Sequence, residues 1–227
     1  MGRLSELKEN LITACHILDR KGVMDEHGHF SVRCPEKGGV LINGKVSPGR
    51  ATEADIILLD LEGNKLEGDS EPASESPLHL AVYQKRPDVM AVAHTHSPMI
   101  VTLSISGIPL RTVENQGACV IGSRVPVFEK YGLVNNFDLG NEVAEALGSH
   151  RMCVLKSHGN IVVGESIEEV CVLALWAERA ALRQYQAMLI GEPHWYPEEE
   201  LEKMRQQEYG SKGHIKTWDY YKWQLSQ

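Results

Sequence analysis

Residues 75–98 read ESPLHLAVYQKRPDVMAVAHTHSP, and this stretch decides the fold expected for the chain. Its first part, Glu75 to Arg86, is predicted to be a helix, which Pro87 ends because proline cannot continue it. The apolar run Asp88–His94 predicts a strand, which continues through Thr95-His96 and leads into another helix at Pro98. A strand enclosed by two helices in so short a stretch indicates an α/β protein.

The segments on either side extend this pattern. Helices are predicted over Leu4–Lys21 and over Ile167–Ile190, where Ser166 and Glu169 form a capping box and Gly191 follows the end. Strands are predicted within His27–Arg33, Asp55–Asp60, Met152–Leu155 and Ile161–Val163. Short strands mixed with helices predict a central mixed or mainly antiparallel sheet with helices on its faces. No repeat or linker interrupts the chain, so residues 1–227 are expected to form a single domain.

Composition restricts the class of protein. The 227 residues carry a net charge of −8, which disfavours nucleic acid as a partner, because nucleic-acid binders usually present a basic face. The 5 cysteines include no CxxC pair, so neither a disulfide framework nor a cysteine zinc site is predicted. No apolar run approaches the roughly 20 residues of a membrane span, and no signal-like segment is found. A cytoplasmic protein without a membrane partner is expected.

Three histidines are candidates for one metal site. Residues i and i+2 of an extended strand share a face, so His94 and His96 would present two imidazoles to the same side. His158 precedes Gly159 in a predicted turn, from which a third ring can arrive. Glu75 opens the helix that precedes the pair, where its carboxylate could reach the remaining coordination position. Three histidines with one open position are typical of a catalytic zinc site.

Each of these signals also has a simpler structural explanation. The HxH pair can be two partly exposed strand histidines, His158 can be an ordinary turn residue, and Glu75 can be an acid that complements the helix dipole. His16, His79, His194 and His214 form no comparable cluster and are interpreted as structural or surface residues. The metal hypothesis predicts one divalent ion per subunit, with zinc first and manganese or cobalt as alternatives.

Four short motifs join these pieces. They are Gly28-His29-Phe30-Ser31, Pro72-Ala73-Ser74-Glu75, Ala93-His94-Thr95-His96-Ser97 and Lys156-Ser157-His158-Gly159. In this order and combination the chain resembles the class II aldolase/adducin head family over residues 4–190; that family includes fuculose-phosphate aldolase, ribulose-phosphate 4-epimerase and several decarboxylases. The resemblance implies a three-layer αβα sandwich around a mainly antiparallel sheet, assembled as a homotetramer with sites at subunit interfaces.

The resemblance also assigns roles to individual residues. His94, His96 and His158 would bind the metal, and Glu75 would be the acid/base and a fourth ligand when substrate is absent. The C-terminal tail from about residue 192 to 227, with its aromatic segment Trp218–Trp223, could pack at a subunit interface over a neighbour's active site. It could equally be a docked packing segment.

Two departures from the family pattern bear on the substrate. His29 stands where sugar-phosphate enzymes of the family have asparagine, and Ala73 replaces the first of two serines, leaving Ser74. A phosphate needs several hydrogen-bond donors, so these losses weaken the sugar-phosphate interpretation. His29, Arg33 and Arg50 instead offer cationic candidates for holding a carboxylate, with plain surface solvation as the alternative for the two arginines.

These observations predict a divalent-metal-dependent carbon–carbon lyase that stabilises an enolate or enediolate on a small anionic substrate. A decarboxylase of a hydroxylated carboxylic acid is the first hypothesis, in which His29 contacts the leaving carboxylate or donates a proton. The resemblance suggests dihydroxyaromatic carboxylates and the hydroxy-oxo acids formed from them as candidate substrates. An aldolase or 4-epimerase acting on a sugar phosphate is the second. A non-catalytic adducin-like interaction module is the third, and the retention of all three histidines with Glu75 argues against it.

Overall fold

The computed structural model describes residues 2–227. Its α-helices are α1 (Arg3–Arg20), α2 (Ser76–Lys85), α3 (Pro98–Ile105), α4 (Phe137–Leu147), α5 (Ile167–Ile190), α6 (Glu198–Gly210) and α7 (Gly213–Leu225). Its strands are β1 (His29–Cys34), β2 (Gly39–Asn43), β3 (Ile56–Leu59), β4 (Lys65–Glu67), β5 (Ala91–Thr95), β6 (Val127–Phe128), β7 (Met152–Leu155) and β8 (Gly159–Gly164).

The strands form one sheet in the order β4-β3-β2-β1-β5-β8-β7-β6. Every neighbouring pair is antiparallel except β6 and β7, which run parallel. The prediction of a mainly antiparallel sheet is confirmed. The two strands at the centre, β1 and β5, are those that carry His29 and His94.

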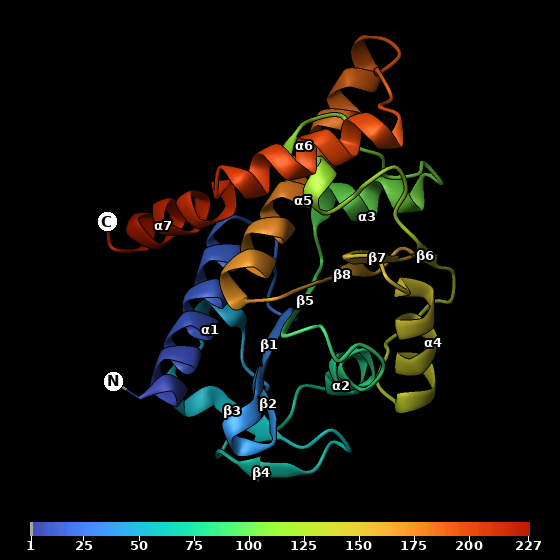
Figure 1. Cartoon of the computed structure of the whole chain (residues 1–227). Coiled ribbons are helices and arrows are strands. Elements are labelled where there is room, and N and C mark those ends of the chain that lie inside the picture. Colours follow the sequence, from blue (N-terminus) through green and yellow to red (C-terminus); the bar gives the residue numbers. More distant parts are fainter. Residues whose placement is uncertain (1) are drawn as a thin grey trace.

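Helices cover both faces of this sheet (Figure 1), with α1, α3, α5 and α7 on one side and α2 and α4 on the other. Successive side chains of a strand point to opposite faces, and the apolar positions sort accordingly. Phe30 and Val32 enter the core beneath α1 and α5, whereas Ile42 and Val92 enter the core beneath α2. The three-layer αβα sandwich predicted for the chain is therefore confirmed.

Most predicted elements lie within a few residues of their observed positions. The helix predicted over Ile167–Ile190 has those limits, and Ser166 accepts the backbone N–H of Glu169 as a cap should. The strand predicted from Asp88 begins only at Ala91, because Asp88 pairs with Arg86 and the backbone N–H of Val89 turns back to the carbonyl of Arg86.

The C-terminal residues form two helices that the sequence did not predict. α7 lies across α5 and the neighbouring part of α1 (Figure 1), whereas α6 packs on the short turn Gln116–Cys119 and on α7. Trp218 is buried in the core beneath them, whereas Tyr220 and Trp223 are exposed. The tail thus packs on its own subunit through Trp218, and its contact with a neighbouring subunit stays a prediction.

Within residues 2–227, no helix has both the length and the apolar content needed to cross a bilayer.

Candidate metal centre

His94 and His96 come together where β5 ends. His94 is fully buried within the strand, and His96 follows the last strand residue, Thr95. Because side chains alternate along an extended segment, both rings lie on the face of the sheet that α2 covers. Their Nε2 atoms are 3.1 Å apart, and the ring planes meet at 86°. The extended HxH pair predicted from the sequence thus brings two ring nitrogens to one point.

The outer nitrogens of both rings contact hydrogen-bond acceptors. The Nδ1 atom of His94 lies 3.2 Å from the carbonyl oxygen of Asn160, and that of His96 lies 2.7 Å from a carboxylate oxygen of Asp25. A carbonyl and an ionised carboxylate can only accept, so each Nδ1 atom must carry a proton. Contacts of this kind orient metal-binding histidines and fix which nitrogen is free to coordinate.

This assignment leaves the two Nε2 atoms facing each other with lone pairs. Burial and the neighbouring His94 lower the pKa of His96, although Asp25 opposes them, so its ring is neutral. In a neutral imidazole with a proton on Nδ1, the Nε2 atom is an acceptor. The 3.1 Å contact between His94 and His96 is therefore no hydrogen bond. Two acceptors held this close repel each other unless a cation lies between them.

His158 approaches the same point from the turn between β7 and β8. Ser157 adopts a left-handed conformation with φ of 58°, and the backbone N–H of His158 donates to the carbonyl of Leu155. Gly159 follows, and a Cβ atom there would lie 2.4 Å from the carbonyl oxygen of Thr95 and 2.9 Å from the His96 ring. Glycine is therefore required for the turn to approach β5 closely enough to bring the third ring in.

Glu75 completes the cluster from the start of α2. One carboxylate oxygen accepts the backbone N–H of Val134 at 2.7 Å. The other lies 3.5 Å from the Nε2 atom of His94 and 3.6 Å from that of His158. Burial raises the pKa of Glu75, but the neighbouring His158 and His94 rings and the backbone N–H of Val134 outweigh it, so the pKa lies far below its ordinary value. The group is an ionised carboxylate, and its side chain does not cap the helix.

These four residues fit a divalent metal ion. One atom from each of Glu75, His94, His96 and His158 lies within 4.8 Å of all the others. Ligand atoms of a tetrahedral zinc site with bonds of about 2.0–2.1 Å lie roughly 3.3 Å apart. The separations of 3.1, 3.5 and 3.6 Å for three of the pairs are close to that spacing, and the other pairs lie within 4.8 Å. Three imidazoles and one carboxylate form a donor set that suits zinc, manganese or cobalt.

A cavity of about 650 Å³ opens beside the cluster. Glu75, His96 and His158 contribute to its wall, together with His29, Lys45, Ser47, Ala73 and Ser74. The structure thus brings the three histidines predicted as metal ligands together with three other predicted site residues, Glu75, His29 and Ser74. A second hollow of about 540 Å³ shares His96 and His158 with the first and continues toward Tyr131 and Lys156.

His29 lies beside His94 in the sheet register, and the two rings stack at 5.7 Å. Burial, and then the neighbouring His94, lower the pKa of His29 to about 3. The expectation that His29 offers a positive charge is therefore corrected, because burial disfavours the charged form. A neutral His29 can still donate or accept a hydrogen bond in the cavity.

The two arginines predicted to bind substrate lie elsewhere. Arg33 donates through Nε to the carbonyl of Val89 at 2.7 Å and through Nη2 to that of Tyr83, and it stacks on the Tyr83 ring. Arg33 therefore has a structural role, because these hydrogen bonds join β1 to the end of α2. Arg50 ends a short turn and is exposed, and neither arginine is among the residues that line the cavity.

Two residues of the centre were missed in the sequence. Asp25 contacts His96 across the fold, and no spacing in the sequence indicates that contact. Lys45 lies just after β2, and pairing β2 with β1 would have placed it at the cavity edge beside His29. The strand β2 was not among the predicted elements, so its position relative to β1 could not point to Lys45.

A three-layer αβα fold with three histidines and a carboxylate converging beside a cavity defines a class of metal-assisted enzymes. Residues 9–185 match the family model described as the Class II Aldolase and Adducin N-terminal domain. The chain therefore belongs to this family, and the resemblance based on the four motifs is confirmed.

Individual relatives agree with this assignment. The chain is 32% identical over 187 residues to 3,4-dihydroxyphthalate decarboxylase of Arthrobacter keyseri. This match covers 77% of this chain and 75% of the relative. It is also 32% identical over 179 residues to 5-deoxy-D-ribulose 1-phosphate aldolase of Bacillus thuringiensis serovar kurstaki, covering 78% and 83%. Among solved structures, an L-fuculose 1-phosphate aldolase superposes with a TM-score of 0.82 at 28% identity, covering 89% and 96%. These relatives are lyases, which confirms the prediction of a metal-dependent lyase at the level of class.

Proposed function

We propose that this chain is a divalent-metal-dependent decarboxylase of a hydroxylated carboxylic acid. The observation that carries the metal-dependent part is the convergence of four acceptor atoms from Glu75, His94, His96 and His158. The observation that favours a carboxylate over a phosphate is the cavity wall, where His29 and Ala73 replace an amide and a hydroxyl. A non-catalytic module would have no need to keep four acceptors facing one point at the cost of their mutual repulsion.

The residues of the cavity can carry out the proton transfers. When bound, a divalent ion would supply Lewis-acid stabilisation of the enolate charge that loss of CO₂ leaves. Glu75, ionised at rest, accepts the proton of a substrate hydroxyl and returns it to the carbon that has lost CO₂. Such proton transfer contributes about 10²–10⁴-fold to the rate. The broken carbon–carbon bond leaves its electron pair on the substrate, so no oxidant or reductant is needed.

The same cavity offers groups that orient the substrate. Lys45 supplies a cation on the wall, and the hydroxyl of Ser74 supplies a hydrogen-bond donor. His29, held neutral by burial, contributes a hydrogen bond to the leaving carboxylate. Two neighbouring hydroxyl oxygens on an aromatic substrate would present adjacent donors to the metal. Similarity to 3,4-dihydroxyphthalate decarboxylase supports this substrate class.

A sugar-phosphate aldolase or 4-epimerase is the second candidate. Lys45, Ser47 and Ser74 line the cavity together and could hold a phosphate without the two lost donors. Similarity to 5-deoxy-D-ribulose 1-phosphate aldolase and to L-fuculose 1-phosphate aldolase favours this alternative.

A substrate panel separates the two candidates. CO₂ release from dihydroxyaromatic carboxylates and their hydroxy-oxo derivatives is measured beside turnover of dihydroxyacetone phosphate with an aldehyde and of ribulose 5-phosphate. We expect CO₂ release from at least one carboxylate. Efficient turnover of either phosphate, with no CO₂ from any carboxylate, would establish the second candidate instead.

A double variant tests why the carboxylate is preferred. His29→Asn with Ala73→Ser restores the amide and the hydroxyl of the sugar-phosphate enzymes. We expect CO₂ release to fall and any activity on phosphates to rise, because two donors are returned to the cavity. Val46→Ala, which shortens an apolar side chain of the same cavity, is the matched control, and it should leave the ratio of the two activities nearly unchanged.

We propose zinc as the native ion, with manganese or cobalt as alternatives, at one ion per subunit. Elemental analysis of protein purified without added metal measures both identity and amount. His96→Ala should abolish metal binding and turnover while the fold persists, because the apolar cores do not depend on this ring. Full activity in a metal-free preparation would contradict the assignment.

A cytoplasmic homotetramer is also proposed. The 5 cysteines are all free and buried, which suits a reducing compartment. The tetramer is supported by the family to which the chain belongs. Light scattering gives the mass directly, and a stable monomer of 25.3 kDa would contradict the tetramer.

A further inference from the structure

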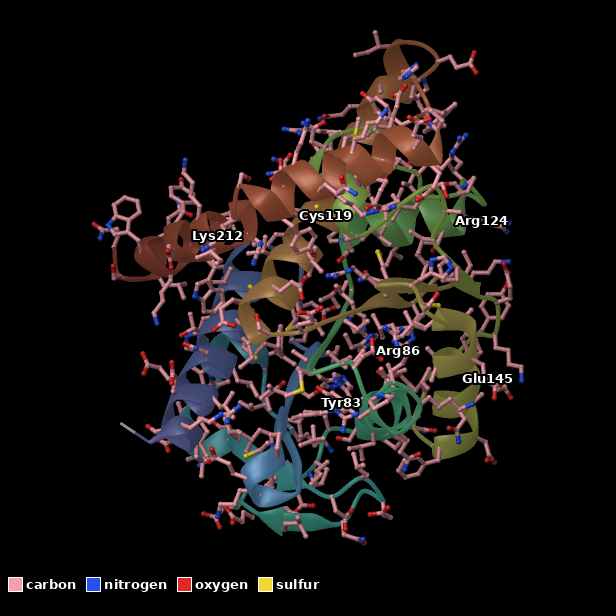
Figure 2. The ribbon with its side chains drawn as sticks, viewed as in Figure 1. Tyr83, Arg86, Cys119, Arg124, Glu145 and Lys212 are labelled. Atoms are coloured by element: carbon pink, nitrogen blue, oxygen red, sulfur yellow. The ribbon has the colours of Figure 1, made fainter. Side chains whose placement is uncertain are left out.

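A buried polar network lies behind the cavity, between α2 and the sheet. Ser31 of β1 is 2.7 Å from the Nδ1 atom of His79 and 2.9 Å from the hydroxyl of Tyr83, measured from its Oγ atom. His79 and Tyr83 are one turn apart on α2, and all three side chains are at most 1% exposed. Figure 2 labels Tyr83 on the side of α2 that faces the sheet. Polar groups at such depth are costly unless they are hydrogen-bonded.

The direction of these hydrogen bonds follows from counting donors. A serine hydroxyl has one proton, so it can donate either to His79 or to Tyr83. If Tyr83 donates to Ser31, then Ser31 donates to the Nδ1 atom of His79, and the proton of the neutral His79 ring lies on Nε2. Each order leaves one buried donor without a direct acceptor, at a cost of about 1–3 kcal/mol: the reverse order leaves the Tyr83 hydroxyl proton, and the first leaves the Nε2–H group of His79. Only the first order places that donor on a ring beside another unpartnered nitrogen, the Nδ1 atom of His29. The first order is therefore favoured.

The Nε2–H group that results belongs to a ring that packs against the His29 ring. The Nε2 atom of His79 and the Nδ1 atom of His29 are both buried without a hydrogen-bond partner among residues 2–227. The two rings meet edge to face, with centroids 5.9 Å apart at 71°. One unpartnered donor and one ring nitrogen able to accept thus lie on neighbouring rings. A small ring movement or one bridging water would join them.

We propose that His79 is a positioning residue for His29. Tyr83 and Ser31 hold His79 with its proton on Nε2, and that N–H donates toward the Nδ1 atom of His29, directly or through one water. His29 then keeps its own proton on Nε2, which can meet a substrate carboxylate in the cavity. The inference rests on the proposed contact between His29 and substrate, and it explains why a polar network is retained in an apolar core.

The tautomers are measured without substrate, on the full chain with ¹⁵N-labelled histidine. Two-bond and three-bond ¹⁵N–¹H correlations distinguish a proton on Nδ1 from one on Nε2. We expect the Nε2–H form for both His79 and His29 in the wild type, and loss of the single form of both rings in Ser31→Ala. An Nδ1–H form of His79 in the wild type would overturn the proposal, whatever the reaction proves to be.

Kinetics on two variants provide the second measurement. In His79→Gln the introduced amide can occupy the position of the Nε2 atom, whereas in His79→Asn the shorter side chain reaches only the position of Nδ1. We expect kcat/KM to fall by about 10–100-fold in His79→Asn, as for other groups that orient a site residue, with smaller losses in His79→Gln and unchanged metal content. Val32→Ala, on the opposite face of β1, is the control for loss of packing. Equal rates in both His79 variants, or a loss matched by Val32→Ala, would reduce the network to a structural role.

Discussion

Asp25 provides a direct test of the metal centre, because it contacts a ligand and not the ion. Its carboxylate oxygen lies 2.7 Å from the Nδ1 atom of His96, and its side chain is 43% exposed. Partial burial raises the pKa of Asp25, but the backbone N–H of His27 and the His96 ring outweigh it, so the pKa lies below its ordinary value. Asp25 is therefore ionised at pH 7, and it holds His96 with Nε2 free to coordinate.

Removing this contact should weaken metal binding by a predictable amount. Loss of a carboxylate that orients a metal-binding histidine costs about 10–100-fold in affinity. Solvent screens the half-exposed Asp25, so we expect about 10-fold for Asp25→Ala, which corresponds to about 1.4 kcal/mol. Asp25→Asn should lose less, because an amide oxygen still accepts the Nδ1–H group while the charge is gone.

Zinc affinity is measured at pH 7 by competition with a chelating dye. Glu26→Gln is the matched control, since it removes a neighbouring exposed carboxylate that lies 3.8 Å from the His27 ring. The expected order of affinity is wild type and Glu26→Gln, then Asp25→Asn, then Asp25→Ala. An affinity of Asp25→Ala within about twofold of the wild type would refute the reasoning that the outer contacts set the ligand nitrogens.

Three further predictions concern the surrounding structure. Gly159→Ala should lower zinc affinity and the unfolding midpoint together, because its Cβ atom would lie 2.4 Å from the Thr95 carbonyl; zinc titration and urea unfolding check this. Burial raises the pKa of Glu178 to about 7 despite two backbone donors, so its contribution to stability is full below its ordinary pKa of 4.5 and is lost as pH rises to 7. In urea unfolding, the free energy of unfolding of Glu178→Gln should therefore rise relative to that of the wild type between pH 4.5 and 7, by about 3 kcal/mol at most. Arg33→Met should lower stability by about 1–3 kcal/mol through lost hydrogen bonds to carbonyls, yet leave zinc affinity unchanged.

The part of the site that could be predicted from sequence depends on local geometry. Alternation along an extended strand places His94 and His96 on one face whatever the rest of the fold does. Ser166 and Gly191 limit α5 through backbone hydrogen bonds within a few residues. Asp25 could not be found in this way, because its contact with His96 joins segments that only the folded sheet brings together.

Arg33 shows how far the same periodicity can mislead. It lies on the same face of β1 as His29, as alternation requires, but four residues further along the strand, roughly 13 Å at about 3.3 Å per residue. At that distance it meets the end of α2 and the carbonyls of Val89 and Tyr83 instead of the cavity. An alternating strand pattern determines the face of the sheet on which a side chain lies. Whether that side chain reaches the cavity depends on how far along the strand it stands and on how the strand pairs with its neighbours.

On the face of the sheet that α2 covers, each side chain of β1 therefore has a different role. His29 stands at the cavity, Ser31 joins the buried network, and Arg33 holds the end of α2. The alternate residues Phe30 and Val32 face the opposite core and anchor the strand by apolar burial. Because polar and apolar requirements fall on opposite faces, polarity can be concentrated near the metal centre without interrupting either apolar core. A one-residue slip of β1 would exchange the two faces and turn His29 and Ser31 away from the cavity and the buried network, so both depend on the register that pairs His29 with His94.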